Sequence, residues 1–302
     1  MYIDAHCDTM SVLLDSKKVL KNNECHIDLK RMPKGTTQIF AAFIAPDYYD
    51  APMKRAEAII GKLKKETAKK TNKIEFCTNE EERQAALGAK NCAAFASLEG
   101  GEPIQSLEDV AHLHELGIRF VTLTWNAANQ LAGGVESSEG ITPFGRTVVR
   151  ELEKHGMITD VSHLNDRSFW DVMRVSNWPV IASHSCSRSV RNHPRNLTDE
   201  QFRAICQRGG VVGINFYTKF LNGRKKADIR NILKHIDHFL KIGGENHIGL
   251  GSDFDGVATL PKEIEGVQDM PKLEEAFREH GYSEKLIKKI MYGNFERIFR
   301  LL

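Results

Sequence analysis

The sequence predicts an α/β fold in which eight parallel strands alternate with helices, the (β/α)8 or TIM barrel. Eight short segments are rich in β-branched and apolar residues, and amphipathic helical patterns separate them. No Gly-x-Gly-x-x-Gly motif follows the first of these segments, which argues against a doubly wound dinucleotide-binding sheet. Because no internal repeat or linker interrupts the pattern, residues 1–302 are expected to form one catalytic domain.

The predicted strands are apolar along nearly their whole length, as parallel strands are when both faces of the sheet are covered. We expect them at residues 2–5, 38–45, 92–98, 118–124, 157–161, 179–183, 210–216 and 247–252. The segment between residues 21 and 37 is the main departure from strict alternation of strand and helix.

The helices between these strands carry start and stop signals. An apolar face over residues 53–63 predicts a helix after the second strand, and the stripe over residues 229–240 predicts another that stops at Gly243. Polar side chains that can cap a helix stand at the expected starts. These caps are Ser106, Asp166, Thr198 and Ser283.

The composition is that of an ordinary globular protein, with 41% hydrophobic and 27% charged residues. A net charge of +2 gives no support for a nucleic-acid partner. No run approaches 18 apolar residues and the N-terminus has no signal-peptide pattern, so we expect a cytoplasmic protein without a membrane partner. The six cysteines are scattered without a Cys-x-x-Cys pair and are interpreted as free thiols.

In a (β/α)8 barrel the chemistry lies at the C-terminal ends of the strands, so polar residues at those ends are the candidates for a site. The first strand runs into His6 and Asp8, whose side chains share one side of an extended backbone. Four later strands end in comparable residues. These are Glu99, His163, His184 and Asp253.

Histidines and carboxylates in this combination favour zinc and its neighbours among the metal ions. Two such ions sharing one carboxylate can hold a water between them as hydroxide at neutral pH, and Glu99 is the natural bridge. Many barrel hydrolases use a carbamylated lysine as the bridge instead, yet no predicted strand here ends in lysine. The remaining histidines lie in helical patterns or loops, and no chemistry is assigned to them.

The order and spacing of these motifs resemble the membrane (renal) dipeptidase family of zinc-dependent barrel peptidases. The similarity covers almost the whole chain. The matching segments are residues 4–8, 97–101, 160–163, 183–185, 195–199, 251–256 and 293–297.

The resemblance implies two zinc ions per chain, one bound by His6 and Asp8, the other by His163 and His184, with Glu99 bridging both. It implies Asp253 as the acid/base carboxylate. Arg195 would hold the substrate's terminal carboxylate and Tyr217 would line the pocket, and a homodimer is the assembly that the resemblance implies.

The chain departs from the family pattern after the fourth predicted strand. The animal enzymes carry a histidine there that contacts the substrate's carbonyl region, and this chain has Trp125 followed by Asn126. Trp125 is therefore placed at the substrate, but it cannot take the polar role of histidine with the same geometry. The animal enzymes are also secreted and lipid-anchored, and that location does not carry over to this sequence.

The leading hypothesis is hydrolysis of a dipeptide, including substrates with a D-residue at the C-terminal position, by a hydroxide that bridges the metals. A second reading keeps the metal site and changes the substrate to another amide, such as a lactam or an N-acyl amino acid. A third reading is a barrel that binds metal and peptide without cleavage, and the intact Asp253 beside the full ligand set argues against it.

Overall fold

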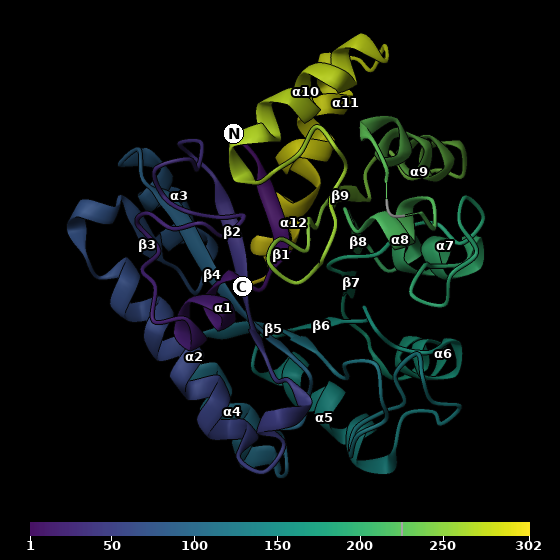
Figure 1. Cartoon of the computed structure of the whole chain (residues 1–302). Coiled ribbons are helices and arrows are strands. Elements are labelled where there is room, and N and C mark those ends of the chain that lie inside the picture. Colours follow the sequence, from purple (N-terminus) through teal and green to yellow (C-terminus); the bar gives the residue numbers. More distant parts are fainter. Residues whose placement is uncertain (225) are drawn as a thin grey trace.

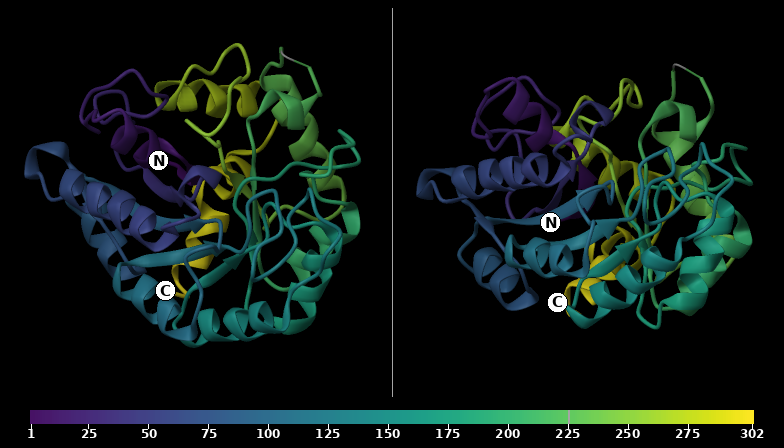
Figure 2. Two further views of the ribbon diagram at one scale, coloured as in Figure 1. Left: turned by 60° about the horizontal axis from the view of Figure 1, so that its bottom comes forward. Right: turned by 90° about the horizontal axis from the view of Figure 1, so that it is seen from below.

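Eight parallel strands close into a barrel surrounded by helices in the computed structural model, which describes residues 1–224 and 226–302 (Figures 1 and 2). The ring begins with β1, which lies between β2 and β9, and it closes where β4 pairs with β2. The predicted (β/α)8 barrel is confirmed. The strands are β1 (Ile3–Cys7), β2 (Thr37–Phe43), β3 (Ile74–Phe76), β4 (Cys92–Glu99), β5 (Ile118–Thr122), β6 (Ile158–Asp160), β7 (Ile181–Ala182), β8 (Val211–Ile214) and β9 (Ile248–Leu250).

All eight predicted strands are present, and β3 is an additional strand that the sequence did not reveal. It pairs only with the first half of β4, while β5 pairs with the second half, so β3 lies outside the closed ring. With three residues, of which one is buried, β3 is too short to give a periodic signal. The connection from β2 to β4 therefore contains two helices and this strand instead of one helix.

Twelve α-helices are found in the described residues, and most of them pack around the outside of the barrel (Figure 2). They are α1 (Thr9–Asp15), α2 (Pro52–Thr67), α3 (Glu80–Gly88), α4 (Leu107–Glu115), α5 (Pro143–Lys154), α6 (Asp166–Val175), α7 (Asp199–Gln207), α8 (Thr218–Leu221), α9 (Ile229–Lys241), α10 (Met270–Glu279), α11 (Glu284–Lys288) and α12 (Asn294–Phe299).

The predicted helix caps agree with the structure at three of four positions. Ser106 and Thr198 form complete capping boxes, and Ser283 accepts from the backbone of α11. The expectation for Asp166 is wrong, because Asn165 caps α6 and accepts from the Ser168 N–H at 2.8 Å. Both side chains can cap, but the N-cap needs an extended backbone, and Asn165 has it with ψ of 169°.

Two separate hydrophobic cores flank the strands. The larger lies between the barrel and the helices, and the smaller fills the barrel's interior. The C-terminal helix α12 contributes Phe295 and Phe299 to the interior core. Gly249 on β9 leaves room for this helix, because a Cβ there would overlap the Phe295 ring. An apolar plug thus fills part of the barrel's interior and leaves the polar strand ends for a site.

Candidate active site

The strand β1 delivers His6 and Asp8 to the barrel's interior through a bulge. Ala5 packs in the interior core, whereas Cys7, two residues later, packs in the outer core. Between Asp4 and Cys7 the pairing with β2 slips, since three residues of β1 advance against two of β2. Such a bulge reverses the phase of the following side chains. The sequence predicted that the side chains of His6 and Asp8 lie on the same side of the strand. They point into the barrel only because of this bulge.

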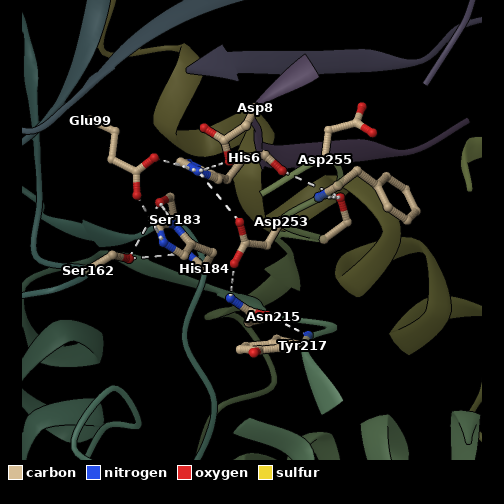
Figure 3. A network of polar contacts seen from close by, with 12 residues as sticks. His6, Asp8, Glu99, Ser162, Ser183, His184, Asn215, Tyr217, Asp253 and Asp255 are labelled. Carbon is tan, nitrogen blue, oxygen red and sulfur yellow. Dashed lines mark hydrogen bonds and ion pairs between the residues drawn. The ribbon is translucent and has the colours of Figure 1, made fainter. Parts of the chain in front are cut away.

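Glu99 stands at the end of β4, in phase with Ala93 and Phe95, which pack inside the barrel. Its two oxygens face different histidines (Figure 3). Oε2 lies 3.2 Å from His6 Nε2, and Oε1 lies 3.0 Å from His163 Nε2 and 3.7 Å from His184 Nε2. This carboxylate joins two groups of side chains, as a bridging ligand would.

The rings of His163 and His184 meet at their Nε2 atoms, which are 2.9 Å apart. His163 Nδ1 donates to the side-chain oxygen of Asn126 at 2.9 Å. His184 Nδ1 lies 2.7 Å from the oxygen of Ser183, whose own hydrogen goes to Asp160. Both imidazoles thus carry their proton on Nδ1, and two Nε2 lone pairs face each other.

A cation placed between these nitrogens would satisfy both lone pairs. Burial and the charge of Arg195 lower the pKa of His163 to about 4, and burial with the charge of His6 lowers that of His184 well below its usual value. At neutral pH both rings are therefore uncharged, and neither has a proton to share between the two Nε2 atoms. Neutral imidazoles with converging lone pairs are the form in which histidine binds a metal ion.

Asp160 organises this pair from behind. One of its oxygens accepts from the backbone N–H groups of Ser162 and Ser183, and the other accepts from the hydroxyls of Ser183 and Thr122. Ser183 in turn orients His184 (Figure 3). The sequence motif contained Asp160, but nothing marked it as a support because its partners lie on neighbouring strands.

The other group is dominated by carboxylates. His6 Nε2 lies 3.4 Å from Asp8 Oδ2 and 3.9 Å from Asp253 Oδ1. Gly256 fits closely against both carboxylates, where a Cβ would overlap their oxygens. These three polar side chains are nearly inaccessible to solvent.

The close approach of the Asp8 and Asp253 carboxylates to one another around His6 favours positive charge in this half of the site. Burial opposes protonation of His6, but the charges of Glu99 and Asp8 outweigh it and hold the pKa of His6 well above its usual value. Burial and the charge of Glu99 raise the pKa of Asp8 to about 8, and burial also raises that of Asp253. A divalent cation would neutralise these carboxylates directly.

Two groups of three side chains each place their potential metal-ligand atoms within 4.8 Å of one another, and the groups share His6. One contains His6, Glu99 and His184, and the other contains His6, Asp8 and Asp253. Mixed imidazole and carboxylate donors suit zinc and its neighbours. The donor set and the facing lone pairs therefore fit a metal centre.

Two of these site residues have a backbone conformation that is uncommon for non-glycine residues. His163 has φ of 70° and Asp253 has φ of 62°, both in the left-handed region. Such conformations carry a cost and cluster where a side chain must be aimed for function.

A cavity of about 880 Å³ opens above these residues and includes the other predicted site residues. Arg195, Tyr217 and Trp125 all line it, together with Glu99 and Asp253. The structure thus brings all nine predicted site residues to one end of the barrel.

Arg195 is buried yet forms no ion pair with any carboxylate of the described residues. Its Nη2 donates to the His184 carbonyl at 3.3 Å, its Nε has no partner in that same part of the chain, and its guanidinium lies 5.3 Å from the Phe220 ring centre. A buried guanidinium with donors to spare is a site for an anionic group such as a carboxylate.

Sequence reasoning missed Asn215, which follows β8 and orients two predicted residues (Figure 3). Its amide donates to Asp253 Oδ2 at 2.8 Å, and its oxygen accepts from the Tyr217 N–H at 2.6 Å. The same rule that selected Glu99 could have found it, because Asn215 is the polar residue directly after a buried strand.

His26 was assigned no chemistry, and it anchors the loop that carries Asp253. Its Nδ1 accepts from the Asp255 N–H at 2.8 Å, and its own N–H donates to Asp255 Oδ1 at 2.7 Å. The segment between α1 and β2, which broke the predicted alternation, thus fastens the end of β9.

The family model for the membrane dipeptidases, peptidase family M19, matches residues 1–302. The chain belongs to this family. A protein of Klebsiella pneumoniae encoded in the region 5′ of pqqA is 34% identical over 79% of this chain and 92% of its own length. An uncharacterized dipeptidase of Schizosaccharomyces pombe is 32% identical over 82% of this chain and 65% of its own length.

Solved structures of family members share the fold of this dipeptidase. A metallopeptidase named dipeptidase AC has a TM-score of 0.92 at 31% identity and covers 99% of this chain and 97% of its own. A metallopeptidase of Rhodobacter sphaeroides, solved with a phosphinate mimic of the dipeptide L-Ala-D-Ala, has a TM-score of 0.91 at 30% identity, covering 99% and 98% of the two chains. The predicted family and the predicted peptide hydrolase are confirmed.

Within residues 1–224 and 226–302, no helix has the length and apolarity needed to cross a bilayer.

Proposed function

We propose that this family member is a zinc-dependent dipeptidase that acts on dipeptides, including those with a D-residue at the C-terminal position. The observation that carries the proposal is the bridging position of Glu99 between facing histidines and a carboxylate cluster. His6 and Asp8 would hold one ion, His163 and His184 the other, and Glu99 both. The ions would supply a polarised water whose pKa is lowered toward neutrality.

Asp253 is proposed to move the proton of that water to the leaving amine. Water adds its oxygen to the peptide carbonyl carbon, the C–N bond breaks, and the nitrogen leaves with the proton that Asp253 accepted. The amide of Asn215 fixes one oxygen of Asp253 at 2.8 Å, so the other oxygen is directed toward His6 and the centre. A carboxylate whose pKa is raised by burial suits this exchange.

Arg195 would limit the substrate to short peptides. Its unpaired donors at the cavity wall offer a forked site for a terminal carboxylate. A carboxylate bound there fixes how far the scissile bond can lie from it, so longer peptides do not fit. The L-Ala-D-Ala mimic bound by the Rhodobacter sphaeroides relative supports acceptance of a D-residue at the C-terminal position.

The substitution Asp253→Asn tests the proposed function. We expect the variant to keep two metal ions per chain, measured by elemental analysis, and to lose turnover of dipeptides by about 10²- to 10⁴-fold. Asp50→Asn, an exposed position outside the cavity, is the matched control and should behave as wild type. Undiminished turnover by Asp253→Asn would contradict the acid/base role.

The substrate class is tested with the zinc-loaded wild type on L,L- and L,D-dipeptides, N-acyl amino acids and lactams. Dipeptides should be hydrolysed with the highest kcat/KM. Faster hydrolysis of N-acyl amino acids or lactams would favour the other amide hydrolase, and failure to release amine from any substrate would favour binding alone.

A further inference from the structure

The position after β5 where the animal enzymes of the family carry a histidine is occupied by Trp125, which forms an aromatic wall. Its ring packs edge-on against Phe43 at 5.2 Å and lies 6.3 Å from the ring of His163. The polar residue at this part of the cavity is the next one, Asn126, which lines the cavity beside His163. Its surroundings show what it can contribute.

Asn126 is held firmly in place. Its backbone carbonyl accepts from the Glu136 N–H at 2.8 Å, and Gly134 fits so tightly against this carbonyl that a Cβ there would overlap it. The Val135 N–H donates to the carbonyl of His163 at 2.9 Å. The loop of residues 125–136 is thus tied by hydrogen bonds to the segment that carries His163.

The two ends of the Asn126 amide face different surroundings. Its oxygen accepts the Nδ1–H of His163, which fixes the ring and leaves the Nε2 lone pair toward Glu99 and His184. Its nitrogen therefore points away from that ring, and within residues 1–224 and 226–302 it donates to no protein group. The residue is half-buried on the cavity wall, so these N–H groups are open to a bound molecule.

We propose that Asn126 has two roles: its side-chain oxygen positions His163 for metal binding, and its side-chain nitrogen donates to the carbonyl oxygen of the scissile amide. The second role rests on the proposed dipeptidase function. Negative charge develops on that carbonyl oxygen as water adds to the carbon, and a fixed N–H donor is worth most there. Asn126 thereby supplies the contact that Trp125 cannot.

Two substitutions separate the roles. Asn126→Asp keeps an oxygen that accepts from His163 Nδ1 but has no N–H to donate. We expect it to bind two zinc ions with at least wild-type affinity, measured by competition with a chelator, while kcat falls by about 10²- to 10³-fold. Asn126→Leu keeps the size but loses both groups, so zinc affinity at one of the two sites should also fall by about 10- to 100-fold.

The matched control is Asn177→Asp, the same chemical change at an exposed position outside the cavity, which should leave zinc affinity and kcat unchanged. Circular dichroism and thermal unfolding report whether each variant folds. If Asn126→Leu does not fold, Asn126→Ala replaces it in the zinc titration.

Each result decides one role. Wild-type kcat in Asn126→Asp would overturn the donor role, and wild-type zinc affinity at both sites in Asn126→Leu or Asn126→Ala would overturn the positioning role. If the zinc-loaded wild type releases amine from no dipeptide, the donor role falls together with the proposed function. The zinc titration still decides the positioning role in that case, because it needs no substrate.

Discussion

The two halves of the candidate centre offer a metal ion different chemistry, although both are buried and both contact Glu99. The acidic half gathers Asp8 and Asp253 around His6, and the charges of Glu99 and Asp8 hold the pKa of His6 well above its usual value despite burial. The imidazole half turns two neutral rings toward each other and lowers the pKa of both. One half has an excess of negative charge, and the other has lone pairs without a proton.

This difference between the halves explains how one carboxylate, that of Glu99, could act as a ligand in both. Glu99 turns one oxygen to each, and the charge of His6 helps to hold its pKa well below the usual value despite burial. In the acidic half a cation would relieve repulsion between carboxylates, whereas in the imidazole half it would satisfy two nitrogen lone pairs that face each other. We therefore expect the two ions to respond differently to substitution.

Removing the bridge should have the largest effect. Glu99→Gln loses the charge and one of the two ligand oxygens, so both halves should release metal. Changes to residues that only support a ligand cost about 10- to 100-fold in metal affinity, and the loss of this shared ligand should exceed that range at both sites. Isothermal titration with zinc on the metal-free protein measures it.

Glu102→Gln is the control for this substitution. Glu102 is also buried, three residues further along, and accepts from Asn129 at 3.1 Å, but it does not line the cavity. It should retain both ions. Two tightly bound ions in Glu99→Gln would show that the carboxylate is not the bridge.

Gly256→Ala should damage the acidic half alone. The new methyl group would overlap the oxygens of Asp8 and Asp253 and displace them, while the backbone of Gly256 is outside the left-handed region and accepts alanine. We expect one zinc ion per chain instead of two, retained by the imidazole half, and a loss of most turnover. Elemental analysis of the dialysed protein gives the count.

Gly61→Ala provides the matched substitution, because a Cβ at this position in α2 meets no atom within 4 Å. It should keep two ions and gain up to about 1 kcal/mol in stability from the better helix propensity of alanine. If Gly256→Ala also keeps two ions, the carboxylates tolerate displacement and the acidic half is less rigid than the structure indicates.

The smallest effects should come from the two serines that support the halves from behind. Ser183→Ala removes the oxygen that accepts from His184 Nδ1 at 2.7 Å, so the ion of the imidazole half should bind about 10-fold more weakly. Ser252 donates instead to buried Asp4, at 2.5 Å, and contacts no imidazole nitrogen. Ser252→Ala should cost about 1 to 3 kcal/mol of unfolding free energy and leave the imidazole half's affinity unchanged.

Zinc titration and thermal unfolding of both variants sharpen the comparison. If Ser183→Ala and Ser252→Ala each weaken zinc binding equally at both sites, the two halves are structurally coupled. If each substitution weakens zinc binding only in the half that its serine supports, the metal affinities of the two halves are independent.

Much of the site was predictable because its residues obey a local rule. A polar residue at or shortly after the end of a buried parallel strand lies at the end of the barrel where chemistry occurs, and this rule selected Glu99, His163, His184 and Asp253. Asn215 follows the same rule and was overlooked. Asp160 and Asn126 were not recognised because they act through partners far away in the sequence.

The sequence by itself determined the eight barrel strands, three of the four expected helix caps, the candidate site residues and the family, because apolar periodicity and motif order are local properties of the chain. The tertiary structure alone decided three things. The bulge in β1 turns His6 and Asp8 inward, and β3 adds to β4 outside the ring. Long-range hydrogen bonds fix the ring protons, from His163 to Asn126 and, for His184, through its neighbour Ser183 to Asp160. Each depends on the register between strands or on contacts across the barrel, which no local pattern encodes.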